Sequence, residues 1–293
     1  MTVSQGLDPA SPRRLFGAEL RRLRREQGKL LSDVAKHVMF SPSKLSRLEK
    51  GQSVPQERDV RDLLDYYGQS GTELGDRMHR WALEGREALQ AWREATDTVP
   101  STIEQYMQYE TAASLIYGYV SHFVPSLLQT ASYARALISA LNSTDPDEIA
   151  ALVDLRLRRQ EVISRDEFPV SLDIIIDESV FHRVVGTPTI MREQIARLAD
   201  ASELPNVTLR VHPFSAGPHA ALSEGTFTIF QFRQPIDQEV VNIESMITEV
   251  YIDQPERVAR YRESLDGLKA IALSPAEATQ FIRRMSHSLS VSQ

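Results

Sequence analysis

The segment SPSKLSRLEKG at residues 41–51 constrains the fold more than any other part of the sequence. Ser41 is a preferred N-cap residue, and Pro42 suits the first position of a helix. Leu45 and Leu48 are three residues apart and therefore share a face, and the closing glycine is typical of a helix end. This spacing predicts a short helix with buried leucines and a polar, basic outer face.

Two more helices are predicted just upstream. Residues 15–28 place leucines on one face and arginines on the others, and they end on a glycine that suits a helix C-terminus. Residues 31–39 turn Val34, Ala35 and Val38 inward, and the small Ala35 permits a close helix crossing. A helix, a three-residue turn and a second helix with a basic outer face match the geometry that enters a DNA major groove.

Charge is distributed unevenly along the 293 residues. The net charge is −7, yet residues 1–62 hold 13 Lys and Arg against 8 Asp and Glu, while the remainder holds 20 against 32. A basic head on an acidic body is the asymmetry expected when only the head contacts phosphate.

The composition also excludes several classes of protein. The chain has no cysteine, so disulfides, thiolate zinc sites and a cysteine nucleophile are excluded. The first residues lack the apolar core of a signal peptide, and no stretch is apolar enough to span a membrane. We therefore expect a cytoplasmic, nucleoid-associated protein with no membrane contact.

Five segments are predicted along the chain. They are a flexible N-terminus (1–11), a helix-turn-helix domain with a connecting helix (12–96), a linker (97–102), an α+β domain (103–287) and a disordered tail (288–293). The fold class is α+β overall, with an all-α, five-helix N-terminal domain and a small, mostly antiparallel sheet in the second domain.

Periodicity assigns the elements of the second domain. Helices are predicted at 103–117, 130–141, 146–165, 188–203, 255–272 and 275–286. Strands are predicted at 170–176, 207–212 and 226–232, followed by a hairpin of 240–245 and 247–252.

Residues 15–67 resemble the Cro- and phage-repressor-like (XRE) helix-turn-helix family, and the run SKLSRLEKG is among its most specific signatures. The resemblance implies that Ser43, Ser46 and Arg47 reach base edges, that Lys44 reaches phosphate, and that Arg24 pairs with Glu49. The predicted DNA-binding set is Ser41, Pro42, Ser43, Lys44, Ser46, Arg47 and Lys50.

Two departures from that family affect these expectations. Leu30 and Leu31 stand where the family usually has Ser or Thr followed by a phosphate-binding Gln, so Ser32 is the alternative cap. Pro42 replaces a residue that often contacts DNA. The competing interpretation is a helical bundle whose arginines form a solvated face; the agreement of spacing, caps and charge favours the DNA-binding interpretation.

Four motifs carry a second resemblance. They are VPSLLQTASYAR (124–135), LRLRRQEVISR (155–165), NVTLRVHPFSAG (206–217) and ALSPAEATQFIRRM (272–285). In this order they are similar to an actinobacterial family that joins an XRE head to a C-terminal, toxin–antitoxin-like domain of long-unassigned function. The resemblance implies a small acidic partner protein encoded nearby.

The body offers little recognisable chemistry. His212, His219 and Glu224 are close in sequence, but their spacing matches no standard ligand pattern. Asp177 and Glu178 follow a predicted strand, where the first turn of a helix explains them. We predict no metal, no cofactor and no catalytic residue, and hence not an enzyme.

The helix at 153–165 leaves two interpretations open. Arg156, Arg159 and Gln160 belong either to a solvated basic face or to a buried or interfacial ion network.

The leading hypothesis is a sequence-specific transcriptional regulator that binds double-stranded DNA as a homodimer and docks the small acidic partner. In the alternative, the body senses a small metabolite through a pocket walled by Phe214, Phe227 and Phe230. An enzyme fused to a DNA-binding head is the third hypothesis.

Overall fold

The computed structural model describes residues 11–95, 101–233, 239–243 and 250–291. They fall into two compact units that divide the chain after Ala112, with a short segment from Phe232 onward grouped with the first unit. The predicted flexible terminus and linker lie outside the described residues, except that α1 begins at Ser11 and α6 at Ser101.

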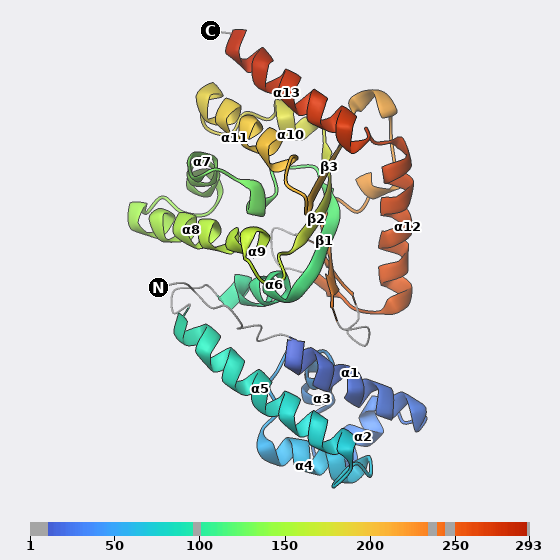
Figure 1. The fold of residues 1–293 in the computed structure, drawn as a ribbon. Coiled ribbons are helices and arrows are strands. Elements are labelled where there is room, and N and C mark those ends of the chain that lie inside the picture. The colour runs from blue at the N-terminus through green and yellow to red at the C-terminus, as the bar shows by residue number, and fades with distance from the viewer. Residues whose placement is uncertain (1–10, 96–100, 234–238, 244–249, 292–293) are drawn as a thin grey trace. The chain divides into compact units, whose positions relative to one another are not determined.

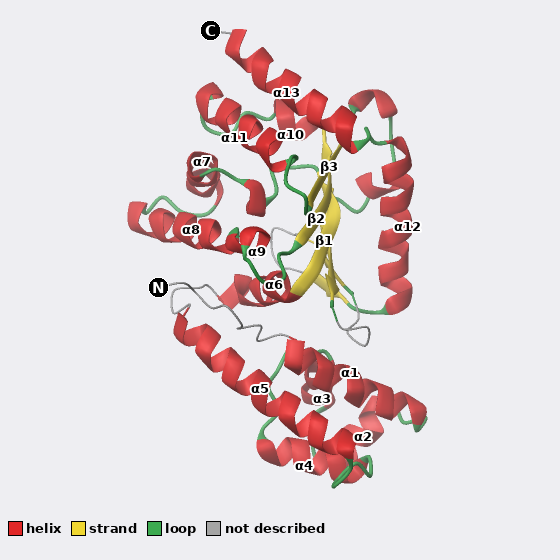
Figure 2. Ribbon diagram, in the orientation of Figure 1, coloured by secondary structure: helices red, strands yellow, loops and turns green. Residues whose placement is uncertain are grey.

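The first unit is helical, as predicted (Figure 2). Its described helices are α1 (Ser11–Glu26), α2 (Leu31–His37), α3 (Pro42–Glu49), α4 (Glu57–Tyr66), α5 (Glu73–Ala95) and α6 (Ser101–Ala112). The expected count was five, and α6 is the additional helix of this unit.

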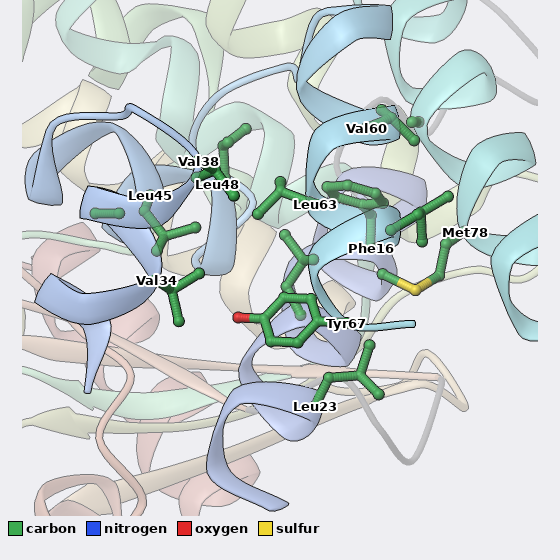
Figure 3. Close-up of a cluster of buried hydrophobic side chains, with 14 residues drawn as sticks. Phe16, Leu23, Val34, Val38, Leu45, Leu48, Val60, Leu63, Tyr67 and Met78 are labelled. Atoms are coloured by element: carbon green, nitrogen blue, oxygen red, sulfur yellow. The ribbon is translucent and has the colours of Figure 1, made fainter. Parts of the chain in front are cut away.

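One apolar cluster holds α1 to α5 together (Figure 3). Phe16 and Leu20 of α1, Leu45 of α3 and Leu63 of α4 are almost fully buried, and Met78 of α5 closes the cluster. Short helices of seven or eight residues, such as α2 and α3, are marginal in isolation. Their stability therefore comes from this shared core.

A six-stranded mixed sheet organises the second unit, in the order β3-β2-β1-β4-β5-β6. The strands are β1 (Ala113–Val120), β2 (Ser171–Asp177), β3 (Val207–His212), β4 (Phe227–Phe232), β5 (Val240–Ile243) and β6 (Val250–Ile252).

Strand direction changes in the middle of this sheet. The strands β1, β2 and β3 run parallel, whereas β4, β5 and β6 pair antiparallel. The Ser114 hydroxyl donates a hydrogen bond to the carbonyl of Gln231, and the amide of Ser121 donates one to the hydroxyl of Thr226. Because the later residue along β1 meets the earlier residue along β4, these two strands are also antiparallel. The mostly antiparallel character was predicted, but the sheet is larger than expected.

The prediction was wrong at β1, where a helix was expected over residues 103–117. The helix α6 ends at Ala112, and the chain continues as the strand ASLIYGYV. Nothing between Thr111 and Ala113 breaks a helix locally, so the switch is imposed by tertiary structure. Because β1 pairs with β2 and neighbours β4, its apolar residues are buried inside the sheet.

The other predicted helices of this unit are present. They are α7 (Ala131–Leu141), α8 (Pro146–Arg159), α9 (Glu161–Ser164), α11 (Pro188–Ala201), α12 (Pro255–Ile271) and α13 (Pro275–Val291), and the single turn α10 (Ser179–His182) joins them. Helices α7 to α11 lie on one side of the sheet and α12 lies on the other (Figure 1).

The tail prediction was also wrong for most of its length. Helix α13 continues to Val291, into the segment 288–293 that was expected to be disordered, and residues 292–293 lie outside the described part. Once a helix is nucleated, each further residue adds one hydrogen bond, so polar residues without Pro or Gly can extend it. None of the helices in the described part of the chain combines the length and apolar character that a bilayer crossing requires.

Gly118 on β1 allows β4 to approach closely. A methyl group at this position would lie 2.2 Å from the carbonyl oxygen of Phe227. We predict that Gly118→Ala lowers the free energy of unfolding by about 1–3 kcal/mol, because the added carbon overpacks a sheet backbone that cannot move aside. Urea denaturation followed by circular dichroism measures the change.

A matched substitution separates this clash from a general effect of glycine replacement. Gly267 is in α12 with no atom within 4 Å of an added methyl group, so Gly267→Ala should stabilise the chain by about 0.5–1 kcal/mol. Equal and small effects at both glycines would contradict the proposed close contact.

Candidate nucleic-acid interface

A four-residue turn joins α2 to α3, one residue longer than predicted. Met39 in this turn has a φ of 55°, in the left-handed region, and its side chain is exposed. The amide of Phe40 donates to the carbonyl of Ala35 at 2.8 Å, which is the 6→1 hydrogen bond of a Schellman motif. The turn therefore has a defined geometry although it contains no glycine.

The start of α3 follows from the local sequence. The hydroxyl of Ser41 accepts a hydrogen bond from the backbone amide of Lys44 at 3.1 Å, and Pro42 occupies the first helical position. Leu45 and Leu48 are buried in the core. The opposite face is consequently turned to solvent.

The outer face of α3 is polar and accessible. Ser41, Pro42, Ser43 and Arg47 are exposed, while Lys44, Ser46 and Lys50 are half-buried. A guanidinium nitrogen of Arg47 donates to the hydroxyl of Ser43, one helical turn away, at 3.2 Å. Arg47 and Ser43 thus lie side by side at the surface.

Lys44 has partners within the unit that lie far from it in sequence or outside the motif. Its ammonium nitrogen lies 2.7 Å from a carboxylate oxygen of Asp59 and 4.0 Å from the ring centroid of Phe40. The other oxygen of Asp59 accepts the amide of Gln56 at 3.0 Å and so caps α4. Lys44 therefore ties α3 to the start of α4.

An ion pair joins α1 to the last residue of α3. Arg24 donates to the two carboxylate oxygens of Glu49 at 2.6 and 2.7 Å, and the Glu49 side chain is only 3% exposed. Planar, bidentate pairing of this kind fixes orientation as well as distance.

The same two helices also make a close backbone contact. A methyl group on Gly17 would lie 2.3 Å from the carbonyl oxygen of Leu48. Gly51, just beyond α3, has a φ of 66° and would place a methyl group 2.9 Å from the α-carbon of Arg14. Neither position admits a larger residue without movement of the backbone.

The expected cap on α2 was wrong. Leu30, not Ser32, is the N-cap residue, and it makes no side-chain cap hydrogen bond. Ser32 lies inside the helix, where its hydroxyl approaches the carboxylate of Asp33 at 3.4 Å. Leu31 packs against the core, so its burial, and not a cap, sets where the helix begins.

Several basic side chains remain accessible around the two helices. Within the described part of the chain, five of them form no ion pair, and they are Arg25, Lys29, Lys36, Arg47 and Lys50. Such charges attract phosphate at little cost, because no existing pair must be broken.

In the second unit, the basic helix turns hydrogen-bonding side chains inward, with Arg159 buried and Arg156 and Gln160 half-buried. Arg156 donates to the side chain of Gln129 at 2.8 Å, and Arg159 to the hydroxyl of Ser126 at 3.2 Å. Gln160 donates to the carbonyl of Gln129 at 2.7 Å. The solvated-face interpretation is therefore wrong: α8 clamps the turn that precedes α7.

The structure brings His212 and His219 together but places Glu224 elsewhere. The two imidazole centroids are 4.3 Å apart, whereas the Glu224 carboxylate accepts the hydroxyl of Tyr261 at 2.8 Å. The third group beside the histidines is Asp177, which lies opposite His212 in the sheet. Sequence spacing missed it because the two positions are 35 residues apart.

The aromatic residues proposed to wall a metabolite pocket do not do so as a group. Phe227 and Phe230 are fully buried, and Phe227 belongs to the core between the sheet and α12. Phe214 is exposed and stacks on His182.

Two family models match this chain. One, described as a helix-turn-helix domain, covers residues 15–76, and the other, described as a domain of unknown function (DUF5753), covers residues 103–284. No curated protein and no solved structure matches the chain. The first match confirms the helix-turn-helix prediction.

We predict that Glu49→Ala destabilises the chain by about 3 kcal/mol, because it leaves the Arg24 guanidinium without its partner in a largely buried position. Thermal and urea unfolding of the full chain measures the change. Glu26→Ala is the matched control, since it removes an exposed Glu that lies 2.6 Å from Arg22 and should cost under about 1 kcal/mol. Similar losses in both variants would show that the Arg24–Glu49 pair has no special role.

Proposed function

This chain belongs to the family of the domain of unknown function DUF5753, and we propose that it is a sequence-specific, DNA-binding transcriptional regulator. One observation carries the proposal. Helix α3 of a helix-turn-helix domain presents an exposed polar and basic face, while its opposite face is locked into the core. That arrangement suits insertion into the major groove.

Within this proposal, the head recognises DNA in the manner of an XRE regulator. Ser43, Ser46 and Arg47 contact base edges, and Arg47 is the best candidate for bidentate recognition of guanine. Ser41, Pro42 and Lys50 border the same face and approach the DNA backbone. Lys44 contacts phosphate only if its ammonium group leaves or shares Asp59.

Arg47→Ala should cost about 1–3 kcal/mol of specific binding and relax the sequence preference at one position. The binding site is first selected from random duplexes with the full chain, and affinity is then measured by fluorescence anisotropy against specific and scrambled duplexes. Arg77→Ala is the control, because it removes the same charge from an exposed position on α5. Loss of affinity for both duplexes alike, or no loss at all, would refute base recognition by Arg47.

We also propose how the C-terminal unit acts. It forms a homodimer that places two heads on half-sites about one helical turn, or roughly 34 Å, apart, and it docks a small acidic protein. Symmetric dimers are the usual arrangement for readers of paired half-sites, and the resemblance in four C-terminal motifs supports the acidic partner. We propose a regulator and not an enzyme, because the sequence contains no recognisable pairing of a nucleophile with a base.

Light scattering of the full chain at micromolar concentration should give twice the mass of one chain, and a monomer mass would contradict the dimer.

Affinity purification of the tagged chain from its native cells, followed by mass spectrometry, should recover a small acidic protein in near-stoichiometric amount. Recovery of the chain and DNA alone would favour the alternative, a metabolite sensed by the C-terminal unit. That outcome would leave the DNA-binding proposal intact.

A further inference from the structure

Three side chains with metal-ligating atoms meet at the carboxyl end of the parallel strands. Asp177 is the last residue of β2 and His212 the last of β3, and the register places them directly opposite each other. His219 comes from the loop between β3 and β4. One ligating atom from each residue lies within 4.8 Å of the other two.

The histidine nitrogens have no hydrogen-bond partner among the described residues. All four ring nitrogens of His212 and His219 are buried, and the whole His212 residue is only 3% exposed. Nδ1 of His212 lies 3.5 Å from an Asp177 oxygen, which is beyond good hydrogen-bonding distance. Buried polar groups are costly without partners, so two adjacent imidazoles in this state need an explanation.

Asp177 is held in one orientation by its neighbours. Its Oδ1 accepts the amide of Ser179 at 3.0 Å and the hydroxyl of the same residue, and its Oδ2 accepts the hydroxyl of Tyr119 at 2.9 Å. The carboxylate is therefore held in one orientation, as a second layer of hydrogen bonds holds a metal ligand.

His219 is held in place by ring contacts with its neighbours. Its ring centroid lies 4.3 Å from that of His212. Its ring packs edge-on against Tyr119, with ring centroids 4.9 Å apart, so the loop that carries it is held against β1.

We propose that Asp177, His212 and His219 form a binding site for one divalent transition-metal ion, best matched to Zn²⁺. Two imidazoles and one carboxylate are a donor set that zinc uses with an open fourth position. Bond lengths of about 2.0–2.1 Å place tetrahedral ligand atoms about 3.4 Å apart, so small side-chain rotations suffice to close this cluster around an ion. The two imidazole ligands argue against Ca²⁺ or Mg²⁺, which prefer oxygen ligands.

The proposed ion would fasten the β3–β4 loop to the sheet. Asp177 and His212 are fixed at strand ends, whereas His219 lies between the short turns Phe214–Ala216 and Ala220–Leu222. Tyr119 would act as a positioning residue, because it donates a hydrogen bond to Asp177 and is not itself one of the three ligands. This site is independent of DNA recognition and does not rest on the proposed function.

The test uses the full chain, freed of any affinity tag and stripped of metal by a chelator. Titration with Zn²⁺ alone in a calorimeter should show one equivalent bound, together with a rise in melting temperature. Co²⁺ should give the visible absorption of a four-coordinate site.

His219→Ala should weaken Zn²⁺ binding by more than about 100-fold, and Tyr119→Phe by about 10- to 100-fold.

His182→Ala is the matched control. His182 is a nearby, half-exposed histidine that contacts Glu178 and Phe214 and lies outside the cluster, so Zn²⁺ binding should not change. His219 is on a loop, and circular dichroism of its variant checks that the fold is kept. No binding of Zn²⁺ to the wild-type chain, or equal binding by wild type and His219→Ala, would overturn the proposal.

Discussion

The contact between α1 and the C-terminal end of α3 determines what the N-terminal unit can present to a ligand. Gly17 brings the α1 backbone against the carbonyl of Leu48, and the Arg24–Glu49 pair fixes the rotation of α3 about its own axis. A helix of eight residues has little stability of its own. Because this contact holds the leucine face inward, the face carrying Ser43 and Arg47 is directed to solvent as a rigid surface.

A comparable constraint organises the second unit. Parallel strands end at the same edge of a sheet, so residues far apart in sequence meet where β2 and β3 finish. Asp177 and His212 meet in this way, and Gly118 lets β4 lie against β1, which carries Tyr119. Burial of the apolar residues in β1, β2 and β3 stabilises this part of the sheet. The positions of the polar residues at the strand ends are thereby fixed.

The features of α3 could be predicted because they depend on neighbours in sequence. N-capping by Ser41, the proline at the first position and the leucine spacing all act within one or two helical turns. The strand β1 could not be predicted in the same way, since only its partners in the sheet favour an extended chain there. The cluster of Asp177 with His212 and His219 could not be predicted from the sequence either, because it depends on strand register and not on the spacing of residues along the chain. Lys44 illustrates the same limit, since its partner Asp59 lies on another helix.

The pairing of Lys44 with Asp59 bears on the DNA binding proposed for the N-terminal unit. Asp59 also caps α4, so a phosphate that drew Lys44 away would leave a carboxylate that is 8% exposed without its cation. In the proposed mode of binding, cations without such partners, such as Lys36 and Lys50, would form phosphate contacts at lower cost. Each phosphate contact steepens the slope of the logarithm of the binding constant against the logarithm of salt concentration by about 0.9. Under the proposed function, the unpaired cations, and not the total number of basic residues, would set how steeply affinity falls with salt. A chain of net charge −7 would then bind DNA through one small basic surface.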